Sequence, residues 1–183
     1  KLKVREYFNT VTITEELPKA RLAHENAISL ASNIISEVRD GKKLNLEDVR
    51  SAVEPVVQSM LRNADAFFWI SNLRKRDAYQ YSHAINCSLL AVALGRHMGF
   101  AESVLMNLAT GGLLLDIGKS ELPQEMLDNP EALGKTEMVM MRRHVTFGMQ
   151  IVESSGVHNL DVMNMISTHH ERHDGSGYPK RLC

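Results

Sequence analysis

The chain has 183 residues, of which 44% are hydrophobic and 23% charged, the balance of a globular protein, and no apolar run reaches the roughly 18 residues that a membrane span needs. A formal net charge of −1 excludes a global positive field that would attract a nucleic-acid polymer or an anionic membrane. Two cysteines, Cys87 and Cys183, are too few for a disulfide framework or a zinc–thiolate cluster, which indicates either a reducing compartment or a protein that has no use for cysteine.

Hydrophobic periodicity predicts an all-α fold. The first residues are an exception, because Val11 to Thr14 alternate as in a short strand or an extended linker. Beyond them, apolar residues recur at three- and four-residue steps, Gly41 suits the left-handed end of a helix, and Asn45 suits an N-cap. The expected helices span about residues 21–40, 45–63, 64–75, 77–98, 101–115, 136–155 and 159–171.

The amphipathic helix over residues 21–40 is compatible with three roles. Its apolar face would pack in the core of a monomer, form the contact of a homodimer, or continue a signalling helix from an upstream region. Because Lys1 is not a natural start, we expect further sequence before it. The pattern alone does not choose among the three roles.

Five residues with metal-ligating side chains fall on faces or helix ends that the apolar pattern predicts to be buried. Histidines and carboxylates that project inward from several helices are a common way to build a di-metal site. For a single histidine, hydrogen bonding to its neighbours is the commoner explanation, but the combination favours a metal. The candidates are His83 on the expected core side of helix 77–98, Asp116 after the apolar run 113–115, His144 beside Val145, Gly148 and Val152, and the pair His169 and His170 near the end of helix 159–171.

The loop over residues 171–179 is the second informative feature. Gly175 and Gly177 permit close approach of the backbone to a ligand, Arg172 supplies guanidinium donors for phosphate, and Tyr178 supplies a flat ring with a hydroxyl group. This chemistry suits a nucleotide. An ordinary loop after a helix fits the spacing equally well.

Four ordered segments resemble the HD-GYP domains, a branch of the HD phosphohydrolases. They are Asp77–His83, which is similar to the opening of the domain; Leu113–Lys119 with Leu122 and Pro123, which match the histidine–aspartate signature and its Ile-Gly-Lys extension; Glu137, His144 and Gly148, expected on one helix; and His169–Arg172 with Asp174–Pro179, close to a full match to the defining loop.

The resemblance implies a helical bundle that holds two, sometimes three, iron or manganese ions and hydrolyses the bacterial second messenger cyclic di-GMP in the cytoplasm. It implies phosphodiester hydrolysis by a metal-bound hydroxide, with a linear dinucleotide or GMP as product. The implied metal ligands are His83, Asp116, His144, His169 and His170. Asp116 and Lys119 are the implied catalytic residues, and the implied substrate contacts are Lys119, Arg172, Gly177, Tyr178 and Pro179.

The sequence departs from the family at its signature. Leu115 stands where the family has the signature histidine, and a leucine offers no lone pair to a metal. The family also takes an aspartate ligand from a helix beyond the loop, and the given sequence ends before that helix. We therefore expect residues 1–76 to be a helical lead-in and residues 77–183 to be the front portion of an HD-GYP domain. This portion is truncated after the defining loop, which contains Gly177, Tyr178 and Pro179 and is called the GYP loop below.

Two principal hypotheses follow for the function. The first is a cyclic di-GMP phosphodiesterase whose activity Leu115 impairs. The alternative is a noncatalytic regulatory module that binds a partner protein or cyclic di-GMP through the GYP loop. An HD hydrolase acting on another nucleotide is a third possibility, and the GYP loop argues against it.

Overall fold

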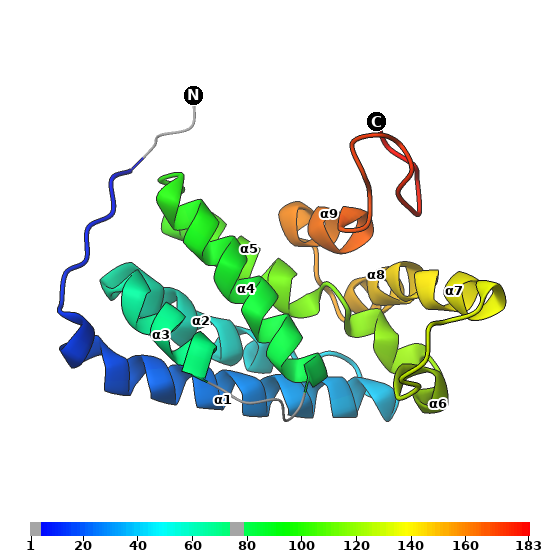
Figure 1. Ribbon diagram of the computed structural model, residues 1–183, viewed down its shortest axis with the longest axis horizontal. Coiled ribbons are helices and arrows are strands. Elements are labelled where there is room, and N and C mark those ends of the chain that lie inside the picture. Colours follow the sequence, from blue (N-terminus) through cyan, green and yellow to red (C-terminus); the bar gives the residue numbers. More distant parts are fainter. Residues whose placement is uncertain (1–4, 74–78) are drawn as a thin grey trace. The chain divides into compact units, whose positions relative to one another are not determined.

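The computed structural model describes residues 5–73 and 79–183 of the chain (Figure 1). Helices make up its regular structure, and this described part contains no β-strand, which confirms the all-α prediction. Within these same residues, none of the helices combines the length and apolar character needed to cross a bilayer. The expected boundary between residues 76 and 77 lies outside the described residues, as does Asp77.

The first of two compact units comprises residues up to Ile34 and Asn45–Leu113. It is built from most of α1 (Ile13–Arg39), α2 (Leu46–Arg62), α3 (Ala64–Leu73), α4 (Tyr79–His97) and nearly all of α5 (Glu102–Leu114). Helix α2 contacts both α3 and α4. Small residues of α1 and branched residues of α2 form much of its core, including Ala20, Ala23, Ala27, Ala31, Val49, Val53, Val56 and Val57.

Helix α1 begins at Ile13, earlier than the periodicity indicates, so the prediction of a strand or linker over Val11–Thr14 is wrong at Ile13 and Thr14, whereas Val11 and Thr12 lie in a non-helical segment. The Thr12 hydroxyl accepts a hydrogen bond from the Glu15 backbone N–H, and the Glu15 carboxylate accepts one from the Thr12 backbone N–H at 2.8 Å. This reciprocal pairing is a capping box, which supplies partners for two N–H groups at a helix start. It outweighs the weak alternation of β-branched residues.

An ion pair between buried Glu16 and partly exposed Arg62 joins α1 to α2 inside the first unit. The Glu16 side chain is fully buried, and its carboxylate accepts hydrogen bonds from Arg62 Nε at 2.8 Å, Arg62 Nη2 at 2.7 Å and Ser59 Oγ at 2.8 Å. These donors compensate the desolvation of the carboxylate, which would otherwise oppose folding.

Helices α4 and α5 run side by side in Figure 1, and a glycine lets them approach closely. A β-carbon on Gly112 would lie 2.6 Å from Ser88 Cα, so the backbones of the two helices touch there. The Ser88 hydroxyl donates to the Ala109 carbonyl at 2.8 Å and closes the contact. This packing fixes the end of α5, the helix that leads toward Asp116.

The second unit comprises Ile35–Leu44 and Leu114–Cys183. After α5 come the 3₁₀ helix η1 (Ile117–Glu121), the single-turn α6 (Gln124–Leu127), α7 (Lys135–Arg142), α8 (His144–Ser154) and α9 (Leu160–Thr168). Helix α8 contacts η1, α7 and α9, which makes it the central element of the unit.

The helix expected over residues 136–155 is divided in the structure. It breaks at Arg143, whose N–H donates to the Met140 carbonyl in a tight three-residue turn, so that His144 begins a new helix. Glu137 therefore lies on α7 while His144 and Gly148 lie on α8, contrary to the single helix expected for all three. The predicted buried face of α8 is confirmed, since His144, Val145, Gly148 and Val152 are buried.

Candidate metal centre

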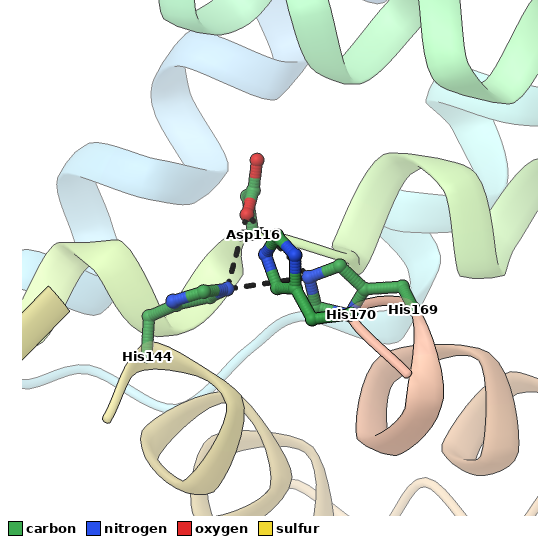
Figure 2. A group of neighbouring side chains, drawn as sticks. All are labelled: Asp116, His144, His169 and His170. Atoms are coloured by element: carbon green, nitrogen blue, oxygen red, sulfur yellow. Dashed lines mark hydrogen bonds and ion pairs between the residues drawn. The ribbon is translucent and has the colours of Figure 1, made fainter. Parts of the chain in front are cut away.

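Four of the five predicted ligands converge in the second unit, as Figure 2 shows. Asp116 lies in the turn before η1, His144 is the first residue of α8, and His169 and His170 directly follow α9. One ligand atom from each lies within 4.8 Å of those of the other three. The cluster thus joins segments that are far apart in the chain.

Backbone carbonyls fix the orientation of two of these imidazole rings. The Nδ1 atom of His144 lies 2.6 Å from the Met141 carbonyl oxygen, and Nδ1 of His169 lies 2.9 Å from that of Ile166. A carbonyl oxygen only accepts, so each Nδ1 carries the proton and donates it. In the neutral rings both Nε2 atoms therefore present lone pairs to the centre of the cluster.

The Asp116 carboxylate has a different partner for each oxygen. Its Oδ2 atom accepts a hydrogen bond from Lys119 Nζ at 2.8 Å, while Oδ1 lies 3.4 Å from His144 Nε2 and 3.8 Å from His169 Nε2. Burial alone would raise the pKa of Asp116, but the ammonium charge of Lys119 and its hydrogen bond to the carboxylate oppose this and hold the pKa well below its ordinary value. Asp116 is ionised at neutral pH.

Two of the histidines are held in the neutral form that ligates metals. Burial lowers the pKa of His144. Burial, together with the neighbouring His169 and His144 rings, lowers the pKa of His170 to about 4. Protons therefore do not compete for these nitrogens at neutral pH, and the pair needs no deprotonation before it binds a cation.

The donor set fits a divalent metal ion. The Nε2 atoms of His144 and His169 face each other at 3.2 Å, beside the Asp116 carboxylate oxygen. Two lone pairs and an anionic oxygen directed at one point repel one another unless a cation lies among them. Imidazole and carboxylate ligands suit iron, manganese and zinc, and the backbone bonds to Nδ1 supply the usual orienting partners.

Close backbone packing and several hydrogen bonds hold the GYP segment (Gly177, Tyr178 and Pro179) in place beside His170. A β-carbon on Gly177 would collide with the backbone of Arg172, Glu171 and His170, so this position needs glycine. The Tyr178 N–H donates to the His170 carbonyl at 3.1 Å. The Glu171 carboxylate accepts backbone N–H bonds from residues 180, 181 and 182 at 2.6, 3.1 and 3.0 Å.

The Tyr178 ring completes one wall of the cluster. It stacks on the His170 ring with centroids 4.5 Å apart and an interplanar angle of 18°. The guanidinium carbon of Arg142 lies 5.0 Å from the centroid of the same Tyr178 ring. Sequence reasoning missed both Arg142 and the bonding role of Glu171; the position of Arg142, two residues before His144, is the only signal that pointed to it.

The fifth predicted ligand, His83, belongs to the first unit and not to the unit that holds the other four. His83 belongs to α4 in the first unit, where its Nε2 lies 3.5 Å from Cys87 Sγ, and the side chain is exposed, as is that of Leu90. The expectation that this face points into a core is therefore wrong for His83 and Leu90, because α4 buries Ala84, Ile85, Ser88 and Leu89 instead. The place of His83 in the metal site stays a prediction.

Arg172 and Leu115 also occupy defined positions. Arg172 is exposed, and its Nε lies 3.5 Å from Asp174 Oδ1. Leu115 is half-buried in the turn that connects α5 to η1, immediately before Asp116. The signature position thus adjoins the cluster in the chain but contributes an apolar side chain.

Comparison with known proteins gives matches across most of the chain. The family model for the HD domain matches residues 56–183. Among curated relatives, the cyclic di-GMP phosphodiesterase PA4108 of Pseudomonas aeruginosa is 28% identical over 94% of this chain and 42% of its own length. A 3'3'-cGAMP-specific phosphodiesterase of Vibrio cholerae is 32% identical over 74% of this chain and 24% of its own length. A cyclic di-GMP phosphodiesterase of Thermotoga maritima is 34% identical over 58% of this chain and 29% of its own length.

A solved structure supports the fold. Bd1817, an HDG"Y"P protein from Bdellovibrio bacteriovorus, superposes with a TM-score of 0.71 over 92% of this chain and 59% of its own, at 20% identity. The chain spans less than half the length of the three curated relatives. The resemblance to HD-GYP proteins expected from the ordered motifs is confirmed by these matches, and the chain belongs to the HD domain family.

Proposed function

We propose that this chain is part of a metal-dependent phosphodiesterase that acts on cyclic di-GMP, with activity reduced by Leu115. The observation that carries the proposal is the 3.2 Å approach of two imidazole Nε2 atoms beside an ionised carboxylate. The names of several relatives as cyclic di-GMP phosphodiesterases support the choice of substrate. Because cyclic di-GMP is a bacterial second messenger, we place the activity in the cytoplasm.

In this proposal His144, His169, His170 and Asp116 hold the metal, which we expect to be iron or manganese, and His83 is a further ligand. A bound divalent ion would lower the pKa of a coordinated water and neutralise charge on the phosphate oxygens. Other groups of the chain would orient these ligands. Met141 and Ile166 carbonyls hold the tautomers of two histidines, and Asp116 keeps one oxygen toward them.

Lys119 and the loop would bind the substrate. The ammonium group of Lys119 lies 2.8 Å from Asp116 Oδ2, so it adjoins the ligand cluster and would contact a phosphate bound there. Gly177, Tyr178 and Pro179, with Arg172 at the rim, would shape the side of the site that receives the nucleotide. Lys119 would thus both balance the charge of the half-buried Asp116 carboxylate and attract an anionic substrate.

The deciding measurement uses the full-length protein loaded with manganese or iron. Hydrolysis of cyclic di-GMP, followed by chromatography of the nucleotides, is expected at a rate below that typical of phosphodiesterases and to disappear on chelation. Neither binding nor hydrolysis of cyclic di-GMP by metal-loaded protein would overturn the proposal.

A noncatalytic role is the second candidate, and Leu115 is the observation that favours it. In that case the protein would bind cyclic di-GMP or a signalling partner protein, as a monomer or homodimer, without hydrolysis. Tight binding of intact cyclic di-GMP by the metal-loaded protein, with no product after prolonged incubation, would support this candidate over the first.

A further inference from the structure

Arg142 is a cation beside the cluster that neither the motifs nor the proposed function uses. It is the last residue of α7, and its guanidinium carbon lies 5.0 Å from the centroid of the Tyr178 ring. The same ring stacks on His170 at 4.5 Å. One aromatic side chain therefore connects a positive charge on α7 with a candidate metal ligand after α9.

The donors of Arg142 are available to an anion. A guanidinium that lies over an aromatic ring keeps its N–H groups in its own plane, so that stacking leaves them free to bond elsewhere. Arg142 is exposed, and it makes no hydrogen bond or ion pair with any residue that the structure describes. By contrast, the guanidinium of Arg172 in the loop pairs with Asp174.

The substrate class of the proposed function presents a matching group. A cyclic dinucleotide carries two phosphodiester groups, so when one is bound at the metal cluster the other is left to be bound by neighbouring residues. The planar fork of an arginine matches the oxygens of a phosphodiester and binds them with two parallel hydrogen bonds. We propose that Arg142, held in place by Tyr178, binds the phosphodiester of the cyclic dinucleotide that is not cleaved.

The inference rests on the proposed function, and a pair of ligands tests it separately. Cyclic di-GMP has two phosphodiesters, whereas the linear dinucleotide GpG has the same two guanines and only one. Arg143 is a matched control, because it is also exposed and its guanidinium carbon lies 4.8 Å from the centroid of another ring, that of Phe147. Affinities would be measured by titration calorimetry on the metal-loaded full-length protein at low temperature, where turnover is slow, with chromatography to correct for any cyclic di-GMP hydrolysed during the titration.

In the Arg142→Ala variant we expect the dissociation constant for cyclic di-GMP to rise about 10-fold, as for loss of a bidentate charged contact, with less than about a 2-fold change for GpG. Arg142→Lys should lose less than Arg142→Ala, and Arg143→Ala should match the wild type for both ligands. Metal content should remain the same in all variants, since Arg142 contacts no ligand atom.

Three outcomes would overturn the inference. Unchanged affinity of Arg142→Ala for cyclic di-GMP would exclude the contact. An equal loss of affinity for GpG would mean that Arg142 contacts a guanine or the phosphodiester that is cleaved. A loss of metal in Arg142→Ala would mean that it positions His170 through Tyr178. If the wild-type protein binds GpG but not cyclic di-GMP, the proposed function itself fails, and this inference fails with it.

Discussion

The backbone of Gly118 lies directly against the carbonyl group of His144. A β-carbon on Gly118 would overlap that oxygen and the Gly148 nitrogen, so η1 and α8 meet here without intervening side chains. Asp116 precedes η1 and His144 begins α8, and this approach brings their side chains to 3.4 Å. A glycine contact in the backbone thus sets the spacing of two candidate ligands.

The first prediction concerns that contact. Gly118→Ala should lower the free energy of unfolding by about 3 kcal/mol, because the backbone of α8 has to move to accept the methyl group. Gly134→Ala is the matched control: Gly134 is exposed and a β-carbon there would meet only Glu137 Oε2 at 3.4 Å, so about 0.5 kcal/mol or less is expected. Urea denaturation followed by circular dichroism measures both, and equal stabilities for the two variants would contradict the argument.

Removal of one imidazole should remove the metal. His169→Ala deletes a ring whose Nε2 lies 3.2 Å from that of His144, and we expect metal affinity to fall about 100-fold or more. His158→Ala, at an exposed histidine of the same unit, should retain the wild-type metal content. Elemental analysis after dialysis gives the stoichiometry. Full retention of metal by His169→Ala would exclude this ligand.

Restoring the signature histidine should increase activity. Leu115→His places a lone pair next to Asp116 in the chain, so we expect higher metal occupancy and an increase of about 10-fold or more in cyclic di-GMP hydrolysis. Leu115→Met preserves volume without an imidazole and serves as the control. If Leu115→His binds the nucleotide as before and gains no activity, the noncatalytic candidate gains support.

The ion pair of buried Glu16 with Arg62 should make the free energy of unfolding depend on pH. Burial by itself raises the pKa of Glu16, but the bonds from Arg62 and Ser59 outweigh it and hold the pKa below its ordinary 4.5. The folded state therefore binds the Glu16 proton less tightly than the unfolded state does. The resulting stabilisation is complete above about pH 4.5 and is lost as the pH falls through the lower folded value.

Glu16→Gln should thus cost about 1–2 kcal/mol at pH 7, because water can solvate the partly exposed Arg62 that remains, and the difference from wild type should shrink toward pH 3. The matched control is Glu54→Gln, which removes a partly exposed partner of Arg50 and should cost about 0.5 kcal/mol or less. Denaturant titrations at both pH values make the comparison. A difference that is independent of pH would refute the ionic explanation.

Local rules predicted much of the fold. The Asn45 side chain accepts from the Glu47 N–H at 3.0 Å and begins α2 as its N-cap, and Gly41 follows α1 with φ of +80°. These features involve neighbours in the chain, which is why the sequence reveals them. The same reasoning failed at Arg143, where one continuous hydrophobic pattern covers two helices and the turn between them depends on backbone bonding.

The site was predicted in its components and only partly in its arrangement. Ordered motifs indicated Asp116, His144, His169 and His170 as a set, and the structure brings these four together. The exposure of His83 was not predicted, because a period of 3.6 residues does not say which face of α4 meets a neighbour. No motif pointed to the contact of Arg142 with Tyr178.

The sequence by itself therefore determined the helical class, the caps at Gly41 and Asn45, the types of ligand and the close approach at Gly177, since each depends on local geometry or on residue chemistry. Tertiary structure alone decided that two Nε2 atoms meet at 3.2 Å beside Asp116 and that Arg142 lies over the GYP tyrosine. The physical reason is that His144 and His169 are 25 residues apart, and their separation in space follows from the packing of α8 against η1 and α9.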